Sequence, residues 1–182
     1  MSRFLFVLLF AVGAFAGQSA TAGYFTAIGH GSLSSNTTGT YNTAVGTQDG
    51  SGYGAMRFNT TGSNNVGIGT GALAQNTTAS QSTAVGYQAL NNNTTGSMTA
   101  VGYQALTANT TGSDNVAVGY QSMYANTNGY EGVALGNQTL YSNTGGQRNT
   151  AIGHNVLRSN STSSDNCGVG WYALRPTTGN SN

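Results

Sequence analysis

A three-residue pattern, a small residue followed by a branched aliphatic residue and a glycine, recurs nine times between residues 27 and 170. In most intervals the aliphatic residues of neighbouring copies lie 17 positions apart. A fixed period of this length predicts a solenoid in which each copy of the repeat forms one coil. The nine aliphatic residues are Ile28, Val45, Ile68, Val85, Val101, Val118, Leu135, Ile152 and Val169.

Two intervals depart from this period, and the regular spacing resumes after each of them. The interval from Val45 to Ile68 is longer than the period, because six extra residues fall within the segment 47–58. The interval from Val85 to Val101 is one residue shorter than the period. We expect the six-residue insertion to be a loop that bulges from one coil.

The composition indicates which kind of coil the repeat forms. The chain of 182 residues contains 28 glycines and one proline and is otherwise dominated by Asn, Thr and Ser. These residues are poor or middling helix formers. We therefore expect an all-β fold over residues 17–182, a parallel β-solenoid (β-roll) of about nine 17-residue coils.

Stacked coils place equivalent residues in columns. A large apolar residue stands five positions after each aliphatic residue, as Leu106 does after Val101, and a threonine, valine or cysteine stands two positions before it. Alternation by two places this last column and the aliphatic column on one face of a short strand. We expect the three columns to form the core, with Cys167 as a small buried member. The small residues between them, such as Ala117, are then expected to face a second and a third chain.

An asparagine stands eight positions after the aliphatic residue in most copies and begins an Asn-Thr-Thr-Gly turn or a variant of it. Asparagine and glycine suit tight corners, and stacked copies predict a ladder of side-chain amides. Most of these asparagines also head an Asn-x-Ser/Thr sequon, so glycosylation behind a secretory signal is an alternative role. The candidate acceptors are Asn36, Asn59, Asn76, Asn92, Asn93, Asn109, Asn137 and Asn160.

Residues 1–16 differ from the repeats. A short positive region that ends at Arg3 precedes an almost wholly apolar run, and Ala14-Phe15-Ala16 has the small-x-small pattern of a signal-peptidase site. The run is shorter than the roughly 20 residues that span a bilayer. Residues 1–16 are therefore predicted to be a secretory signal peptide, which makes the mature chain extracellular and free of a membrane span. The alternative is a retained hydrophobic segment that packs within an assembly.

Composition and spacing argue against several classes of function. Charged residues make up 5% of the chain and the net charge is +1, which leaves no electrostatic surface for nucleic acid or an anionic membrane. The single cysteine excludes an internal disulfide and a cysteine-based metal site. His30 and His154 share a column but lie seven coils apart, so they cannot meet in one site.

The remaining charged residues also fall into columns. One column is expected to be a charge ladder with an arginine between two acids, and another a solvated basic stripe. No nucleophile–base pair, phosphate-binding loop or metal-ligand spacing is present in the sequence. We therefore predict that the chain is not an enzyme and uses no cofactor or metal. The first column holds Asp114, Glu131, Arg148 and Asp165, and the second holds Arg57, Arg158 and Arg175.

The segments 42–46 (NTAVG), 82–90 (STAVGYQAL) and 149–153 (NTAIG) resemble head repeats of trimeric autotransporter adhesins. Similar repeats occur in bacteriophage tail-fibre proteins, and the resemblance covers roughly residues 24–179. It implies a left-handed parallel β-roll, a tight homotrimer and a surface that binds host matrix or receptors. The period of this chain is longer than that of the typical adhesin head coil.

Three functions remain open. The leading hypothesis is a non-catalytic structural subunit of an extracellular fibre or fibril with an adhesive role, which assembles as a homotrimer and head-to-tail into filaments. The alternative is a fibre tip that binds a carbohydrate or a matrix receptor through an aromatic column two positions after the aliphatic residue. An ice-binding solenoid is a minor alternative, and the adjacent Thr37 and Thr38 weigh against it because they point in opposite directions. The candidate ligand-facing residues are Tyr87, Tyr103, Tyr120 and Trp171.

Overall fold

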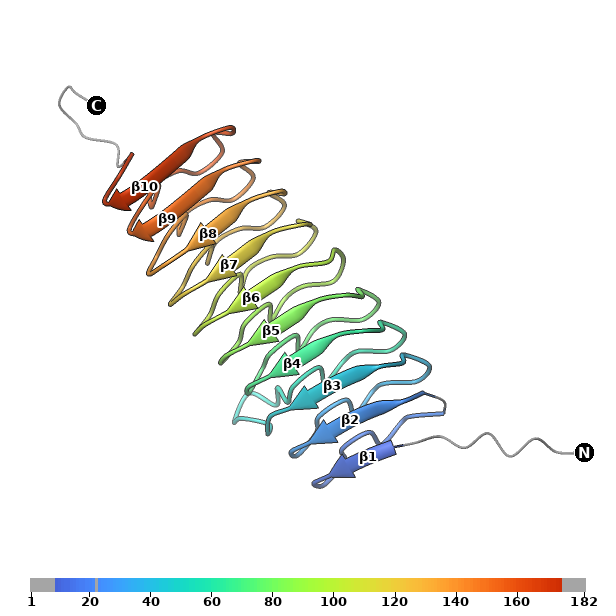
Figure 1. The fold of residues 1–182 in the computed structure, drawn as a ribbon. Helices are drawn as coiled ribbons and strands as arrows, with labels where there is room; N and C mark the ends of the chain where they lie inside the picture. Colours follow the sequence, from blue (N-terminus) through green and yellow to red (C-terminus); the bar gives the residue numbers. More distant parts are fainter. Residues whose placement is uncertain (1–8, 22, 175–182) are drawn as a thin grey trace, which may run out of the picture.

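The computed structural model describes residues 9–21 and 23–174, which form a rod of stacked coils (Figure 1). These residues contain ten strands and no helix, and the strands make one sheet in chain order. The all-β parallel solenoid predicted from the period is confirmed. The strands are β1 (Leu9–Val12), β2 (Phe25–Ile28), β3 (Asn42–Val45), β4 (Val66–Ile68), β5 (Thr83–Val85), β6 (Thr99–Val101), β7 (Val116–Val118), β8 (Val133–Leu135), β9 (Thr150–His154) and β10 (Cys167–Trp171).

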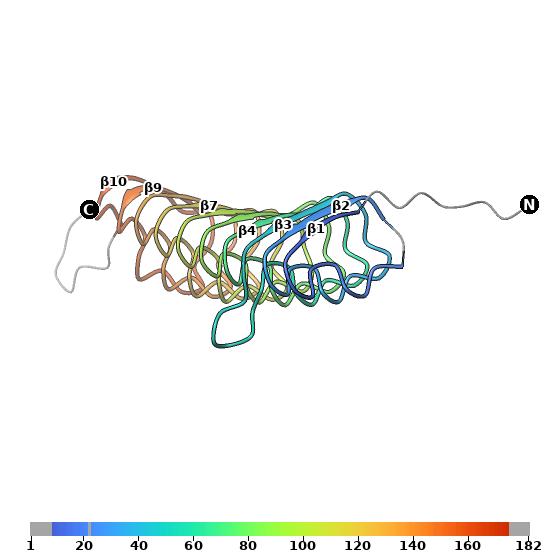
Figure 2. The same cartoon turned by 90° about the horizontal axis from the view of Figure 1, so that it is seen from below.

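Each strand pairs in parallel with the next, and equivalent residues of the repeat stand opposite one another. Val101 of β6 is the register partner of Val118 of β7. The irregular intervals do not disturb this register, since Val45 still pairs with Ile68 across the six-residue insertion. The insertion leaves the rod as a loop on the side away from the sheet (Figure 2).

The structure adds a coil that the sequence pattern did not reveal. Ala11-Val12-Gly13 is a tenth copy of the three-residue pattern, and Val12 of β1 pairs with Ile28 of β2. This strand lies inside the predicted signal peptide. In the structure it pairs with β2, which is the arrangement that the alternative of a retained segment predicts. Cleavage itself stays a prediction, and residues 1–8 lie outside the described part of the chain.

The predicted assignment of the two strand faces is wrong. In β2, β3 and β5–β9 the alanine of the strand is fully buried, as Ala100 and Ala117 are, and it packs with the large apolar column to form the core. The flanking Thr99 and Val101 are only partly buried and lie on the outward side of β6. Cys167 lies on the same outward side and is exposed, so it is not a core residue.

The narrow interior of the coil explains why alanine rather than valine points inward. At Gly67, which replaces the central alanine in β4, an added Cβ would lie 2.7 Å from Cγ of Met56. At Gly168 in β10 it would lie 2.7 Å from a methyl group of Val156. The space opposite a leucine or methionine therefore has room for a methyl group at most, and a branched side chain would overfill it.

The large apolar column occupies a corner where the backbone is left-handed. The φ angles at this corner lie between 48° and 55°. Residues branched at Cβ are genuine outliers in this region, whereas unbranched side chains are tolerated at a modest energetic cost. This explains why the column contains only leucine and methionine, namely Leu33, Met56, Leu73, Leu90, Leu106, Met123, Leu140, Leu157 and Leu174.

The predicted asparagine ladder is present and runs along the rod. Nδ2 of Asn59 donates to Oδ1 of Asn36 at 2.7 Å and also to the carbonyl oxygen of Gly62 in its own turn. The ladder breaks between Asn76 and Asn93, and the turn that Asn93 begins is the one that lacks a residue. Oδ1 of Asn76 is buried there without a hydrogen-bond partner among the described residues, so the shortened coil accounts for the unsatisfied atom.

Leu106 offers a test of the corner, because methionine already occupies this column in two other coils. Leu106→Ile keeps the side-chain volume but places a Cβ branch at a left-handed φ, so we expect the free energy of unfolding to fall by about 1–3 kcal/mol. Leu106→Met should change it by less than about 1.5 kcal/mol. Urea unfolding followed by circular dichroism measures both, and equal stability of the two variants would contradict the argument.

Candidate functional site

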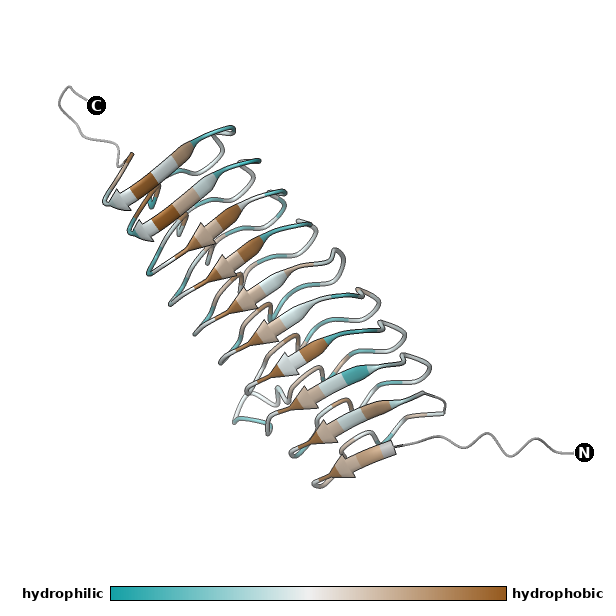
Figure 3. Cartoon of the chain, in the orientation of Figure 1, coloured by the Kyte–Doolittle hydropathy of each residue, from teal (hydrophilic) through white to brown (hydrophobic). Residues whose placement is uncertain are grey.

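The outward side chains of β2–β10 form one continuous surface, which we call the outer face. It consists of the two columns that flank the buried alanines, and apolar residues recur in every strand (Figure 3). None of the strands β1–β10 contains Asp, Glu, Lys or Arg. The aliphatic column is solvent-accessible, with Ile68 39% and Val118 37% exposed. The rod therefore presents water with a regular, uncharged surface rich in β-branched side chains.

The expected subunit-contact face of small residues does not exist at the surface. Ala117, which was expected to face a second chain, is 0% exposed and belongs to the core. A contact between chains would therefore involve side chains other than these alanines.

The aromatic column beside the outer face is a stack of parallel rings. The ring centroids of Tyr87 and Tyr103 lie 5.3 Å apart, and those of Tyr103 and Tyr120 are also 5.3 Å apart, with interplanar angles of 15° and 8°. Each ring face in the middle of this stack is covered by its neighbour. These tyrosines present their edges and hydroxyl groups to a ligand, so they do not form the open platform on which a sugar ring would stack.

Trp171 is the member of the aromatic column with the greatest exposure in the described chain, at 73%. Its indole stacks on the imidazole of His154 with centroids 4.2 Å apart, and its ring also lies 5.4 Å from that of Tyr172. The two histidines of this column do not meet, because His30 packs against Phe15 near the other end of the rod. Trp171 thus belongs to an aromatic cluster at the carboxyl-terminal end.

The inserted loop reaches the aromatic column. The hydroxyl of Tyr87 donates to Oδ2 of Asp49 at 3.4 Å. Burial and the nearby Asp49 carboxylate both raise the pKa of Tyr87 above its usual value. The loop is itself closed by the Asp49 carboxylate, which accepts a hydrogen bond from the backbone N–H of Ser51 at 2.9 Å.

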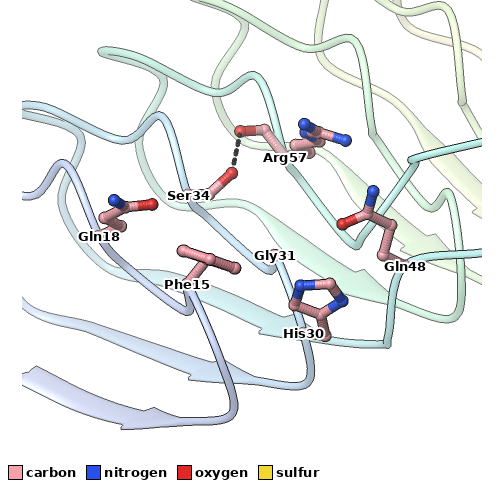
Figure 4. Close-up of a pocket in the computed structure, with 7 residues that line it drawn as sticks. All are labelled: Phe15, Gln18, His30, Gly31, Ser34, Gln48 and Arg57. Atoms are coloured by element: carbon pink, nitrogen blue, oxygen red, sulfur yellow. Dashed lines mark hydrogen bonds between the residues drawn. The ribbon is translucent and has the colours of Figure 1, made fainter.

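A cavity of about 390 Å³ lies between the first coils and the inserted loop (Figure 4). It occurs where Gly31 interrupts a column that holds glutamine in several other coils, so a side chain is missing from the wall. Arg57 is already engaged through its guanidinium with the carbonyl oxygen of Gly52. Phe15, which belongs to the predicted signal peptide, supplies one wall, so the cavity depends on retention of that segment. It is lined by Phe15, Gln18, His30, Gly31, Ser34, Gln48 and Arg57.

The glutamine column forms a second amide ladder further along the rod. Nε2 of Gln104 donates to Oε1 of Gln88, and the same contact joins Gln121 to Gln104 and Gln138 to Gln121, each at 3.0 Å. The column continues with Asn155, whose side chain is one methylene shorter. A pocket of about 240 Å³ opens at this point, and its lining residues are Gln138, Asn155, Arg158 and Tyr172. Sequence reasoning missed this pocket, and the only signal for it was the change from glutamine to asparagine.

The column of charged residues forms one ion pair within the described chain. Nε of Arg148 lies 2.6 Å from Oδ1 of Asp165, and Nη2 donates to Oδ2 at 3.0 Å. The pairing of an arginine with an acid in the next coil is as predicted, whereas no ion pair within the described residues joins Arg148 to Glu131 on its other side. The hydrogen bonds from the guanidinium hold the pKa of the Asp165 carboxyl below its ordinary value.

The side-chain amides of most sequon asparagines already donate hydrogen bonds within the rod. Asn36, Asn59, Asn76, Asn93 and Asn109 are each 0% exposed, and their Nδ2 atoms donate within the rod. A glycan on any of them would remove a donor from the ladder. Glycosylation therefore stays a prediction. The sequon positions that are not buried are Asn92, Asn137 and Asn160, and Nδ2 of Asn160 also donates to Oδ1 of Asn143 in the ladder.

Within residues 9–21 and 23–174, no three His, Cys, Asp or Glu side chains gather closely enough to hold a metal ion. The same residues contain no helix long and apolar enough to cross a membrane. No family model, no curated protein and no solved structure matches the chain.

The ion pair makes the titration of Asp165 testable. Its lowered pKa means that the stabilisation is present above the pKa of the unfolded chain and is lost as the pH falls through the folded value. In Arg148→Gln we expect the pKa of Asp165 to rise toward the ordinary value of about 3.9. An NMR titration of the carboxyl carbon measures this directly, and an unchanged titration in the variant would show that the guanidinium does not control it.

Proposed function

We propose that the protein is a non-catalytic structural subunit of an extracellular fibre and that its chains associate through the outer face. The observation that carries the proposal is the exposed, uncharged sheet surface, rich in β-branched side chains, along the described rod. A contiguous apolar surface on a soluble protein commonly marks a contact with another protein.

The size of the outer face is compatible with such a contact. The nine strands β2–β10 are separated by eight spacings of about 4.8 Å, which gives a length of about 38 Å. Together with the neighbouring aromatic column, the face covers on the order of 700 Å² per chain. A standard interface buries about 800 Å² on each partner, so the whole outer face comes close to the area of one such contact. In a homotrimer, the assembly implied by the adhesin resemblance, each chain would divide this area between its two neighbours.

Association also adds apolar burial that a single rod lacks. The core of one coil is essentially one leucine or methionine and one alanine, which is little burial against the ordering of about 17 residues. An adhesive role would then use whatever surface remains exposed in the assembly, including the inserted loop.

The mass of the protein in solution tests this proposal. We expect light scattering to give three times the chain mass for the unchanged protein. Val118→Glu places a charge on the outer face and should yield monomers with unchanged far-ultraviolet circular dichroism, because a buried unpaired carboxylate is strongly disfavoured. Thr111→Glu, at an exposed corner, is the matched control and should leave the mass unchanged. A monomeric unchanged protein that retains its β signal would refute the proposal.

A second candidate function is ice binding, and one observation now favours it. Thr99 and Val101 are two positions apart and point outward together, so methyl and hydroxyl groups stand in regular rows on the outer face. The objection raised by Thr37 and Thr38 concerned a corner and does not apply to this face. The two functions exclude each other at one surface, because an assembled fibre would cover the rows that ice would need.

Thermal hysteresis distinguishes the two. If the outer face binds ice, the protein should be monomeric, show a gap between melting and freezing, and lose that gap in Thr99→Tyr but not in Thr111→Tyr. A trimer without hysteresis would leave the fibre as the function.

A further inference from the structure

The two outermost strands of the described sheet, β1 and β10, each have a neighbouring strand on one side only (Figure 1). An edge strand presents a row of unpaired backbone N–H and C=O groups, which is a template for pairing with another chain. Soluble proteins commonly block such edges with a charged residue or a proline. The strands Leu9–Val12 and Cys167–Trp171 contain neither, so neither edge is blocked in this way.

The hydrogen bonds inside the rod show which backbone groups β10 leaves available. The N–H of Thr150 in β9 donates forward to the carbonyl oxygen of Asn166 at 2.8 Å. The carbonyl oxygen of Val118 in β7 likewise accepts from a glycine N–H of the following coil at 2.7 Å. The equivalent groups of β10 are the N–H of Cys167 and the carbonyl oxygen of Val169. By this equivalence both point away from β9, where no described strand follows.

β1 presents the complementary groups at the other end of the rod. In the repeat, Leu9 is equivalent to Asn166, and Gly13 is equivalent to the glycine that donates to Val118. The carbonyl oxygen of Leu9 and the N–H of Gly13 therefore face away from β2, and no described strand lies on that side. One edge thus supplies an acceptor and a donor at the positions where the other edge has a donor and an acceptor.

The outward side chains at the two edges match as well. Val118 and Ile152, which have a coil on either side, are each 37% exposed. Val169 is 66% exposed and Val12 is 52% exposed, because each has a described coil on one side only. Pairing of the two edges places these valines side by side and lowers their exposure toward that of the inner members of the column. Apolar area is then buried together with the backbone groups.

We propose that β10 of one chain pairs in parallel with β1 of a second copy, in the register that joins each strand of the rod to the next. Val169 then stands opposite Val12, and the N–H of Cys167 donates to the carbonyl oxygen of Leu9. The N–H of Gly13 donates to the carbonyl oxygen of Val169. A contact between two different surfaces of one protein need not close on itself, so successive copies add along the rod axis. The partner strand lies in the predicted signal peptide, so the contact requires that this segment is retained.

This contact uses the ends of the rod rather than the outer face, so it goes beyond the proposed function and does not depend on it. The end of one coil offers less area than a standard interface. We therefore expect filaments only at about millimolar chain concentration, well above the concentration at which the mass of a trimer is measured.

Electron microscopy of the full chain at millimolar concentration tests the proposal, with a reductant present to keep Cys167 as a free thiol. Pairing of β10 with β1 gives each chain ten strand spacings of about 4.8 Å, so we expect filaments with an axial repeat of about 48 Å. A repeat of about 43 Å would make β2 the partner and overturn the assignment of β1. Discrete rods would overturn the end contact altogether, while their width, one chain or three, tests the outer face separately.

Cys167→Pro removes the N–H that points toward the second copy, and proline is tolerated at the first residue of an edge strand. We expect this variant to keep its far-ultraviolet circular dichroism and to need at least tenfold more protein to form filaments. Cys167→Val is the matched control, because valine occupies this column at Val116 and Val133 and keeps the N–H. It should form filaments as the unchanged protein does, which also excludes a disulfide as the link. Equal filament formation by the two variants, or its loss in both, would overturn the proposal, and the axial repeat of the unchanged protein tests the same contact without a substitution.

Discussion

Side chains in the stacked coils lie one strand spacing from their own equivalents in the coils before and after them. That spacing, about 4.8 Å, is set by the backbone hydrogen bonds of the parallel sheet. A column is therefore stable only if its side chain packs well against a copy of itself. Amides meet this condition by donating and accepting at once, aromatic rings by stacking, and leucine by apolar contact. Like charges do not, which accounts for the 5% content of charged residues and the absence of lysine.

The same constraint gives the interior and the surface of the rod an unusual residue composition. Inside, alanine and leucine fill a coil so narrow that an added methyl group at Gly67 would meet Met56. Outside, the larger β-branched residues stand in rows, and the strands place nothing charged between them. A protein that places its bulkier aliphatic residues on the surface leaves apolar area available for contact with a chain or with an ordered surface. Both proposed functions of the outer face follow from this inversion.

The coils differ from one another where a residue departs from the pattern of its column. The short interval before Val101 leaves Oδ1 of Asn76 without the donor that the next coil would supply, and Gly31 leaves a cavity beside the inserted loop. Asn155 ends the glutamine ladder and opens the pocket that contains Arg158. In a structure so regular, a change of one residue in a column creates a hollow with definite chemistry.

Spacing along the chain was enough to predict the period, the parallel solenoid, the residues of each column, the looped-out insertion and the asparagine ladder, because stacking brings together residues that are one period apart. It was not enough to predict which strand face is buried. Alternation by two places Thr99 and Val101 on one face of the strand. The chain then turns at Gly102 and Gln104, which have positive φ angles, before it reaches Leu106, so counting along the chain cannot say which face the large apolar column meets. The width of the coil, which exists only in three dimensions, decided that Ala100 points inward. The pocket at Asn155 was hidden for a related reason, since it depends on the length of one side chain relative to its neighbours in space.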